Sequence, residues 1–180
     1  MRRADWAEET ARKLLAIPLP RRWAHTQGVA VQARTLAPIL GGNADLLEAA
    51  AWLHDIGYSP DLAAIGFHPL DGARHLRDHE RADGMLCRLV AHHSCAAIEA
   101  EERGLAGELS REFSPPPPDL ADALTYCDMT TGPDGQSVSV DWRLAEVKNR
   151  YGPQHIVSRS IRRSAPLLTE AVRLVHSRAN

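Results

Sequence analysis

The sequence predicts an all-α protein, and its composition carries that prediction. Ala and Leu make up much of the hydrophobic fraction of 44%, while only 5% of the residues are aromatic. Ala, Leu, Arg and Glu favour helices, and the β-branched and aromatic residues that favour strands are sparse. A chain of 180 residues fits one domain, which buries roughly 70% of the surface of the unfolded chain. We therefore expect a single helical domain over residues 1–180.

Apolar periodicity and helix-breaking residues place the elements along the chain. The expected helices cover residues 5–16, 21–36, 44–55, 68–80, 83–93, 96–103, 120–129, 140–150 and 154–177. Pro20 separates the first two helices, and Pro38 with the Gly41-Gly42 pair stops the second. Asn43 is suited to cap the third helix, because its side chain can accept a hydrogen bond from a free backbone N–H.

The second half of the chain contains three further signals. Pro69 stands in the first turn of its helix, where proline is favoured. The run Pro115–Pro118 predicts an extended polyproline connector, and residues 130–139 predict a turn-rich loop. Because candidate functional residues lie on both sides of the prolines, we place this connector inside the domain rather than at a domain boundary.

Charge and cysteine content restrict the partners and the compartment. The net charge of −2 gives no global basic field, so we expect neither a nucleic-acid polymer nor an anionic membrane as partner. The odd, scattered cysteines Cys87, Cys95 and Cys127 indicate free thiols rather than a disulfide framework. No apolar leader follows Met1, and no window approaches the length of a transmembrane helix. These features predict a cytoplasmic protein.

The pair His54-Asp55 ends an apolar run that extends from Leu46 to Leu53. A helix end that buries Leu and Trp has little structural need for an imidazole beside a carboxylate. Adjacent side chains on a helix point about 100° apart, but both can reach one ion where the helix ends. Imidazole and carboxylate together suit Zn, Mn or Fe. Taken alone, the pair is also explained as a helix-terminal histidine followed by a capping aspartate.

Further histidines and an aspartate strengthen the metal hypothesis. They are His25, His68, the pair His92-His93 and Asp128. Asp128 lies four residues after Leu124 and seven after Ala121, on a helix face that we expect to be buried. A buried carboxylate without a partner is strongly unfavourable, and a metal ion would supply that partner.

The ordered set resembles the HD-domain superfamily of metal-dependent phosphohydrolases over about residues 20–130. The local words that carry the resemblance are Trp23-Ala24-His25-Thr26, Leu53-His54-Asp55-Ile56-Gly57, His68-Pro69-Leu70-Asp71-Gly72 and Tyr126-Cys127-Asp128-Met129. The last two look like bacterial hydrolases that cleave dinucleoside polyphosphates symmetrically. The resemblance implies an HD-domain helical bundle with a helical C-terminal extension over residues 138–180.

The resemblance also implies a ligand set for one or two divalent transition-metal ions, with Fe, Mn, Zn, Co and Ni as candidates. The residues implied for the first ion are His25, His54, Asp55 and Asp128. Those implied for the second are His68 and one or both of His92 and His93, with Asp55 as a bridge. We expect both His92 and His93 to face the site. His54 and Asp55 would be the catalytic pair, with Asp55 orienting the water nucleophile.

Substrate-binding residues are suggested by a departure from the family pattern. Many two-metal HD proteins carry a lysine shortly after the His-Asp pair, where this chain has Tyr58. Arginines would then bind the substrate phosphate, which suits their paired donors. The candidate substrate-binding residues are Arg21, Arg22, Tyr58, Arg74, Thr130 and Thr131. Tyr58 would gate the site or stack on a base, and the leaving-group proton would come from His75 or a water molecule.

The function implied is hydrolysis of a phosphoester or phosphoanhydride in a small nucleotide-like substrate by metal-activated water. Two alternatives stay open. One is an HD-fold di-iron oxygenase, and the other is a non-catalytic HD module that senses a nucleotide. A second copy of the chain, as a homodimer, is the other partner that we consider.

Overall fold

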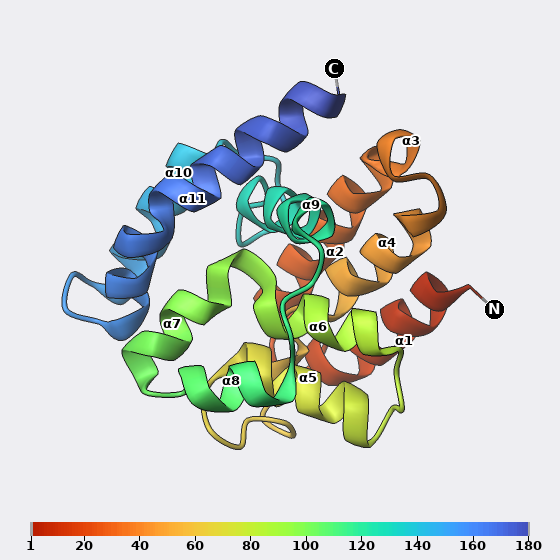
Figure 1. Cartoon of the computed structure of the whole chain (residues 1–180), viewed down its shortest axis with the longest axis horizontal. Helices are drawn as coiled ribbons and strands as arrows, with labels where there is room; N and C mark the ends of the chain where they lie inside the picture. Colours follow the sequence, from red (N-terminus) through yellow and green to blue (C-terminus); the bar gives the residue numbers. More distant parts are fainter. Residues whose placement is uncertain (1, 180) are drawn as a thin grey trace.

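The computed structural model describes residues 2–179, and Figure 1 shows how its helices are arranged. The α-helices are α1 (Arg3–Leu15), α2 (Pro20–Thr35), α3 (Ala37–Leu40), α4 (Ala44–Leu53), α5 (His68–Asp78), α6 (Gly84–His92), α7 (Ala96–Arg103), α8 (Ala106–Glu112), α9 (Pro118–Met129), α10 (Val140–Tyr151) and α11 (Ile156–Ala179). Short 3-10 turns are η1 (Gly41–Asn43), η2 (Ile56–Tyr58) and η3 (His93–Cys95). Residues 2–179 contain no β-strand beyond an isolated bridge between Thr131 and Ser137, so the all-α prediction is confirmed.

Helix α4 is the centre of the core. Every residue from Leu46 to Leu53 is buried, and the small run Ala49-Ala50-Ala51 allows neighbouring helices to approach closely. Helices α1, α2, α6 and α9 all pack against it. The C-terminal end of α4 therefore delivers His54 and Asp55 to the interior of the bundle, where both are buried.

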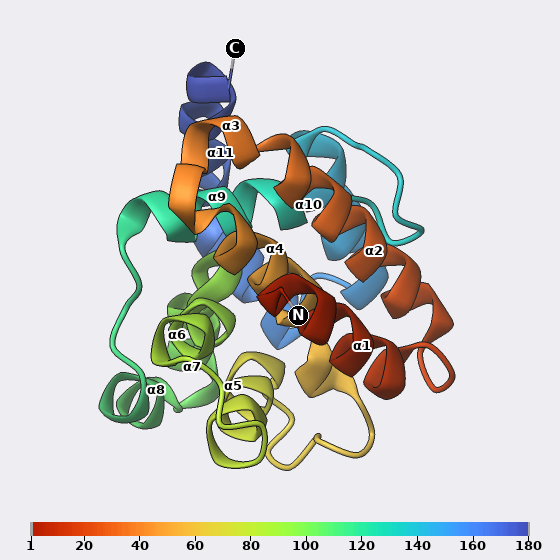
Figure 2. The same cartoon turned by 90° about the vertical axis from the view of Figure 1, so that its right-hand side faces the viewer.

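The C-terminal helices α10 and α11 lie side by side, on the opposite side of the molecule from α1 (Figures 1 and 2). Helix α11 packs along α9 and α7, and α10 packs on α11 and on α9. The loop that leaves α9 after Asp128 leads directly into α10. The extension is thereby held next to the end of α9, close to residues that the sequence assigns to the site.

Two helices and one cap differ from the sequence prediction. Helix α8 was not expected, because Gly107 suggested a break, whereas a glycine in the first turn is tolerated here. Pro38 does not simply stop α2; it occupies the first turn of the one-turn helix α3. The expected cap at Asn43 is wrong, since its backbone is already in the helical region and its side chain caps no N–H.

Gly57 allows a close approach that positions the site. A Cβ atom at this position would lie 2.0 Å from the carbonyl oxygen of His68 and 2.7 Å from the backbone nitrogen of Gly72. Any side chain there would push η2 away from α5. Glycine therefore lets the start of α5 lie against the turn that follows Asp55. None of the helices within residues 2–179 combines the length and hydrophobicity needed to cross a bilayer.

Candidate metal centre

Two groups of three metal-ligating side chains lie next to each other in the core. The group that we call the deep group consists of His25 on α2, His54 at the end of α4 and Asp128 on α9, and all three are buried. The group that we call the outer group consists of Asp55, His68 on α5 and His93 after α6. Within each group, one ligand atom from each residue lies within 4.8 Å of the others. Only the outer group contains a half-buried member, His68, whose side chain is 13% exposed.

The carboxylate of Asp55 faces both groups. Its Oδ2 lies 3.4 Å from Nε2 of His54 and 3.9 Å from Nε2 of His25. Its Oδ1 lies 3.3 Å from Nε2 of His68 and 3.8 Å from Nε2 of His93. The two oxygens of one carboxylate are thus directed to different sets of histidines, which is the arrangement that allows a carboxylate to bridge two ions.

Three of the four histidines are oriented by the same kind of backbone contact. Their Nδ1 atoms lie at hydrogen-bond distance from carbonyl oxygens: His25 from Gly132 (3.0 Å), His54 from Ala51 (2.8 Å) and His93 from Val90 (2.7 Å). Because a carbonyl oxygen only accepts, each Nδ1 carries the proton, and the neutral ring keeps a lone pair on Nε2. Contacts of this kind fix the tautomer and orientation of metal-binding histidines.

The inward-facing atoms fit a divalent cation. Nε2 of His54 is buried without a hydrogen bond, although Oδ2 of Asp55 lies 3.4 Å away. The Nε2 atoms of His68 and His93 approach each other to 3.2 Å. Lone pairs and carboxylate oxygens facing one another at such distances repel unless a proton or a cation lies between them. A donor set of imidazoles and carboxylates suits a transition metal better than Mg or Ca.

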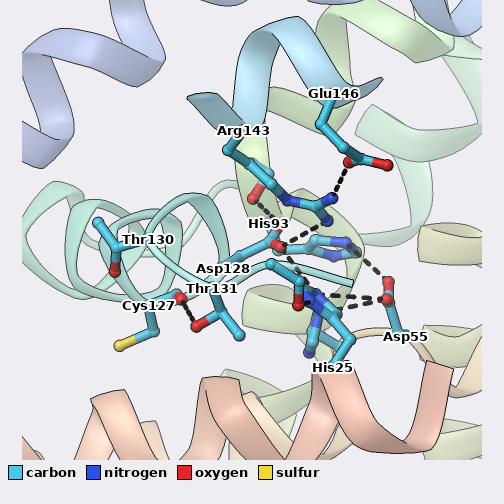
Figure 3. A network of polar contacts seen from close by, with 12 residues as sticks. His25, Asp55, His93, Cys127, Asp128, Thr130, Thr131, Arg143 and Glu146 are labelled. Atoms are coloured by element: carbon cyan, nitrogen blue, oxygen red, sulfur yellow. Dashed lines mark hydrogen bonds and ion pairs between the residues drawn. The ribbon is translucent and has the colours of Figure 1, made fainter. Parts of the chain in front are cut away.

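Asp128 connects the deep group to the C-terminal extension. Its Oδ1 lies 3.1 Å from Nε2 of His25, and its Oδ2 accepts a hydrogen bond from the hydroxyl of Ser94 at 2.5 Å. Figure 3 shows Arg143 of α10 between Asp128 and Glu146, with Nη2 3.8 Å from Oδ1 of Asp128. Nη1 of Arg143 donates to Glu146 at 2.6 Å, and Arg143 is buried. A buried cation therefore ties α10 to the candidate centre.

The electrostatic surroundings favour anionic carboxylates and a neutral His93, while the charge of Asp55 raises the pKa of His54 against the effect of its burial. Burial opposes ionisation of Asp55, but the charge that His54 carries when it is protonated, and then the charge of Arg22, hold the pKa of Asp55 well below the usual range. Burial likewise opposes ionisation of Asp128, where the hydrogen bond with His25 and nearby charges lower the pKa well below the usual range. Burial lowers the pKa of His93 to about 3. At neutral pH both carboxylates are thus anionic and His93 is neutral.

Tyr58 lies between two other site residues. The guanidinium carbon of Arg22 is 3.9 Å from the centre of its ring, and the His68 ring stacks on it with centroids 3.9 Å apart. Two groups at these distances occupy opposite faces of the ring, so Tyr58 has no free face for a substrate base. It supports His68 and Arg22 instead, and Nη1 of Arg22 donates to Oδ2 of Asp55 at 2.7 Å.

The expectation that His92 faces the site is wrong. Nε2 of His92 donates to the carbonyl oxygen of Phe113 at 2.7 Å, and His92 belongs to neither ligand group. Helix α6 ends at His92, and His93 has an extended backbone with φ −59° and ψ 148°. The next two residues, Ser94 and Cys95, have positive φ values of 49° and 60°. This break in the helix turns His93 towards Asp55, whereas the expected helix over residues 83–93 continued through both histidines.

The arginines predicted to bind phosphate lie in different places. Arg22 contacts Asp55, as described above. It also lines a hollow beside Asp55 and His68, which we call the hollow at the metal centre. Arg21 pairs with Asp134 at the surface, with Nε 2.8 Å from Oδ1. Arg74 is held by carboxylates of α8, 2.8 Å from Glu108 and 2.5 Å from Glu112, and is not among the residues that line the hollow.

The hydroxyls of Thr130 and Thr131 point back to α9. Oγ1 of Thr130 donates to the carbonyl oxygen of Tyr126 at 2.7 Å. Oγ1 of Thr131 donates to that of Cys127 at 2.8 Å (Figure 3). Each hydroxyl proton is therefore engaged by the end of the helix. A phosphate needs donors, so these two side chains have only acceptor capacity to offer it.

Arg143 and Ser94 were missed by sequence reasoning. Arg143 lies three residues before Glu146, which is the spacing of an ordinary exposed ion pair. Its neighbours Leu144 and Val147 are buried, and this proximity to the apolar face of α10 was the available signal. Ser94 carries no signal, because its contact with Asp128 depends on the left-handed turn after His93.

An all-helical bundle with paired histidine and aspartate groups at the end of its central helix defines a class of helical metal-binding proteins. The chain belongs to the HD domain family, whose model matches residues 22–129. The match includes every member of the deep and outer groups and ends before α10. Metal-dependent hydrolysis is the typical activity of this family.

A curated protein similar to this chain is ribonuclease Y from Rubrobacter xylanophilus, at 37% identity over 79 residues. The aligned segment covers 44% of this chain and 15% of the length of ribonuclease Y. No solved structure matches the chain. The finer resemblance to symmetrical dinucleoside-polyphosphate hydrolases finds no support in these comparisons.

Proposed function

We propose that the protein is a metal-dependent phosphohydrolase that cleaves a phosphoester or phosphoanhydride bond in a nucleotide-like substrate. The observation that carries this proposal is Asp55, whose two oxygens face His54 and His68 from the floor of a hollow that arginines also line. Divalent ions held by such groups polarise a phosphoryl oxygen and lower the pKa of water, which is the chemistry that hydrolysis needs.

Arg22 and Arg143 are the residues that we assign to the substrate phosphate. Both line the hollow at the centre, together with Asp55 and His68. Arg22 is fixed by its stacking on Tyr58, and Arg143 is buried, so both guanidinium groups are already ordered. A guanidinium presents two parallel donors to phosphate oxygens, and it replaces the positive charge of the missing lysine.

A water molecule is the better of the two candidate proton sources for the leaving group. The ring of His75 stacks on His79 with centroids 5.3 Å apart, and its Nε2 lies 3.5 Å from Glu80. His75 is not among the residues that line the hollow. A general acid must come within hydrogen-bond reach of the leaving oxygen, and the position of His75 does not provide this.

The proposal is tested by a hydrolysis screen with Mn, Fe, Co, Ni, Zn and Mg. The substrates are nucleoside mono-, di- and triphosphates, dinucleoside polyphosphates and generic phosphate esters. We expect metal-dependent phosphate release that His54→Ala reduces about 10²-fold or more and that His79→Ala, at an exposed histidine, leaves unchanged. Wild-type activity in His54→Ala would refute the assignment. Oxygen consumption with ferrous iron, or nucleotide binding without bound metal, would favour the oxygenase or the sensor instead.

A phosphodiester bond of a nucleic acid is the second candidate target. The observation that favours it is the 37% identity to ribonuclease Y, although the aligned segment is a small part of that protein. The net charge of −2 argues against a broad nucleic-acid surface, but local arginines line the hollow. Labelled single-stranded RNA and DNA oligonucleotides in the same screen distinguish the two targets, because only this candidate predicts shortened strands.

A further inference from the structure

The hollow at the metal centre adjoins a larger hollow, which in turn adjoins a third along α10. The adjoining one has a volume of about 330 Å³ and shares Arg22, Arg143 and Arg150 with the first. The outermost one has a volume of about 480 Å³ and shares Arg21 and Arg150 with the second. The shared side chains show that the three hollows adjoin one another in a row, here called the trough, from Asp55 to the outer face of α10.

The middle hollow of this trough is positively charged. Arg21, Arg22, Arg143 and Arg150 line it, and the described residues around it include no carboxylate. The two outer arginines have different partners: Arg21 pairs with the exposed Asp134, whereas Arg150 pairs with the partly buried Glu146, which also pairs with Arg143. An exposed pair contributes little stability, so a phosphate can compete with Asp134 for Arg21. The charge therefore favours a second anionic group, beyond the phosphate at the metal centre.

The outermost hollow adds an exposed aromatic ring. Trp142 is 46% exposed and lines this hollow with Arg21, Arg150 and polar residues that include Glu146. Trp142 and Arg150 are eight residues apart on α10, so they share one face of the helix. A large exposed ring beside guanidinium groups is the combination that binds nucleobases by stacking while arginines contact phosphates. Trp142 and Arg150 lie outside the segment that matches the HD domain.

We propose that the trough binds a second nucleotide unit of the substrate, with a phosphate between Arg21 and Arg150 and a base stacked on Trp142. This inference rests on the proposed phosphohydrolase function, which places the reacting phosphate beside Asp55. The substrate class is then a molecule with two nucleosides joined through phosphate, either a dinucleotide or a dinucleoside polyphosphate. A mononucleotide would fill only the inner part of the trough.

The test compares 5′-AMP with the dinucleotide pApA and with diadenosine tetraphosphate. The wild-type protein should prefer the better two-nucleoside compound over AMP by about tenfold in kcat/KM, because stacking on one aromatic ring has an effect of this order. Trp142→Ala should remove that preference, and Trp142→Phe should retain most of it. The comparison between the two linked compounds shows whether a diester or an anhydride link is used.

The control is Leu167→Ala, because Leu167 is an exposed apolar residue of α11 that lines none of the three hollows. It should leave the preference unchanged. Equal use of AMP and both linked compounds by the wild type, or equal losses on all of them in Trp142→Ala, would overturn the subsite.

Binding measurements separate the subsite from the proposed function. Saturable quenching of tryptophan fluorescence by pApA, which AMP does not produce and which Trp142→Phe abolishes, would support the subsite even if no compound is hydrolysed. Hydrolysis without any preference for two-nucleoside compounds would support the function and refute the subsite. Circular dichroism and thermal unfolding establish that each variant is folded.

Discussion

The deep group and the outer group use the same donor types but are held differently. Each member of the deep group has a second hydrogen bond that fixes it, to a backbone carbonyl for the histidines and to Ser94 for Asp128. In the outer group His93 has such a contact, whereas the half-buried His68 rests on the ring of Tyr58. Preorganised ligands bind metal more tightly. We therefore expect a tight deep site and a weaker outer site that is open to substrate.

Asp55→Asn should have the largest effect, because this residue is the only one that faces both groups among the described ligands. An amide keeps the shape but loses the negative charge that balances the cations. We expect hydrolysis to fall on the order of 10³-fold or more. Metal content, measured by mass spectrometry of the purified protein, should fall in both sites.

The matched control for this change is Asp71→Asn, at another buried carboxylate. Asp71 accepts hydrogen bonds from the backbone of Ile65 and Gly66 and belongs to neither ligand group. It should leave metal content unchanged. If Asp55→Asn kept the metal content and activity of the wild type, the bridging role would be wrong.

His54→Ala and His68→Ala separate the two groups directly. His54 is buried in the deep group, so its removal should abolish the tighter binding event in a metal titration and reduce activity about 10²-fold or more. His68→Ala should weaken the second event and leave the first in place. Isothermal titration calorimetry with Mn or Co measures both. A single binding event that both variants weaken equally would show that the groups hold one shared ion.

Arg143→Ala tests whether the extension supports the deep group. Removing this guanidinium leaves Asp128 without a buried cation that lies 3.8 Å away. We expect activity to fall about 10–100-fold, as for other side chains that orient metal ligands. Arg143→Lys should restore part of the loss, because it returns the charge without the paired donors. Arg173→Ala, which removes an exposed partner of Glu170, is the control and should change nothing.

The resemblance to the HD superfamily assigned His25, His54 and Asp128 to one ion, and local context supported two of these residues. Asp128 is recognisable as a carboxylate on an apolar helix face, and His54 ends an apolar run. The structure brings both together with His25, which lies on the preceding long helix. Helical periodicity indicates which of these side chains face the core, but only the resemblance indicated that they meet at one site.

The outer group and the trough depend on features that periodicity does not encode. The choice between His92 and His93 is made by two residues with positive φ, Ser94 and Cys95, and neither is a glycine. Arg143 has the local spacing of a surface ion pair, and its burial follows only from the packing of α10 on α9 and α11. Tertiary packing determines both features. The sequence alone therefore did not separate His93 from His92 and did not identify Arg143 as a site residue.

Glu112→Gln should have the smallest effect and should act on the outer group alone. Glu112 on α8 pairs with Arg74 and Arg77 on α5, the helix that begins with His68, while no member of the deep group lies on α5. The hydrogen bond with Arg74 first, and the one with Arg77, lower the pKa of Glu112 to about 2. Allowing for partial exposure, we expect a loss of about 1–2 kcal/mol in unfolding free energy at pH 7.

The contribution of Glu112 to the unfolding free energy should depend on pH, because only the ionised carboxylate pairs with the two arginines. The folded-state pKa of Glu112 lies below its ordinary value of 4.5, so its contribution is fully present above that value and is lost as the pH falls towards 2. Urea unfolding of wild type and Glu112→Gln should differ at pH 7 and converge near pH 2, whereas Glu170→Gln, at an exposed pair, should show little difference throughout. A gap that stays constant with pH would refute the ionic explanation. If the variant weakened the deep metal site as much as the outer one, the two groups would not be held independently, and their different anchoring would have no functional consequence.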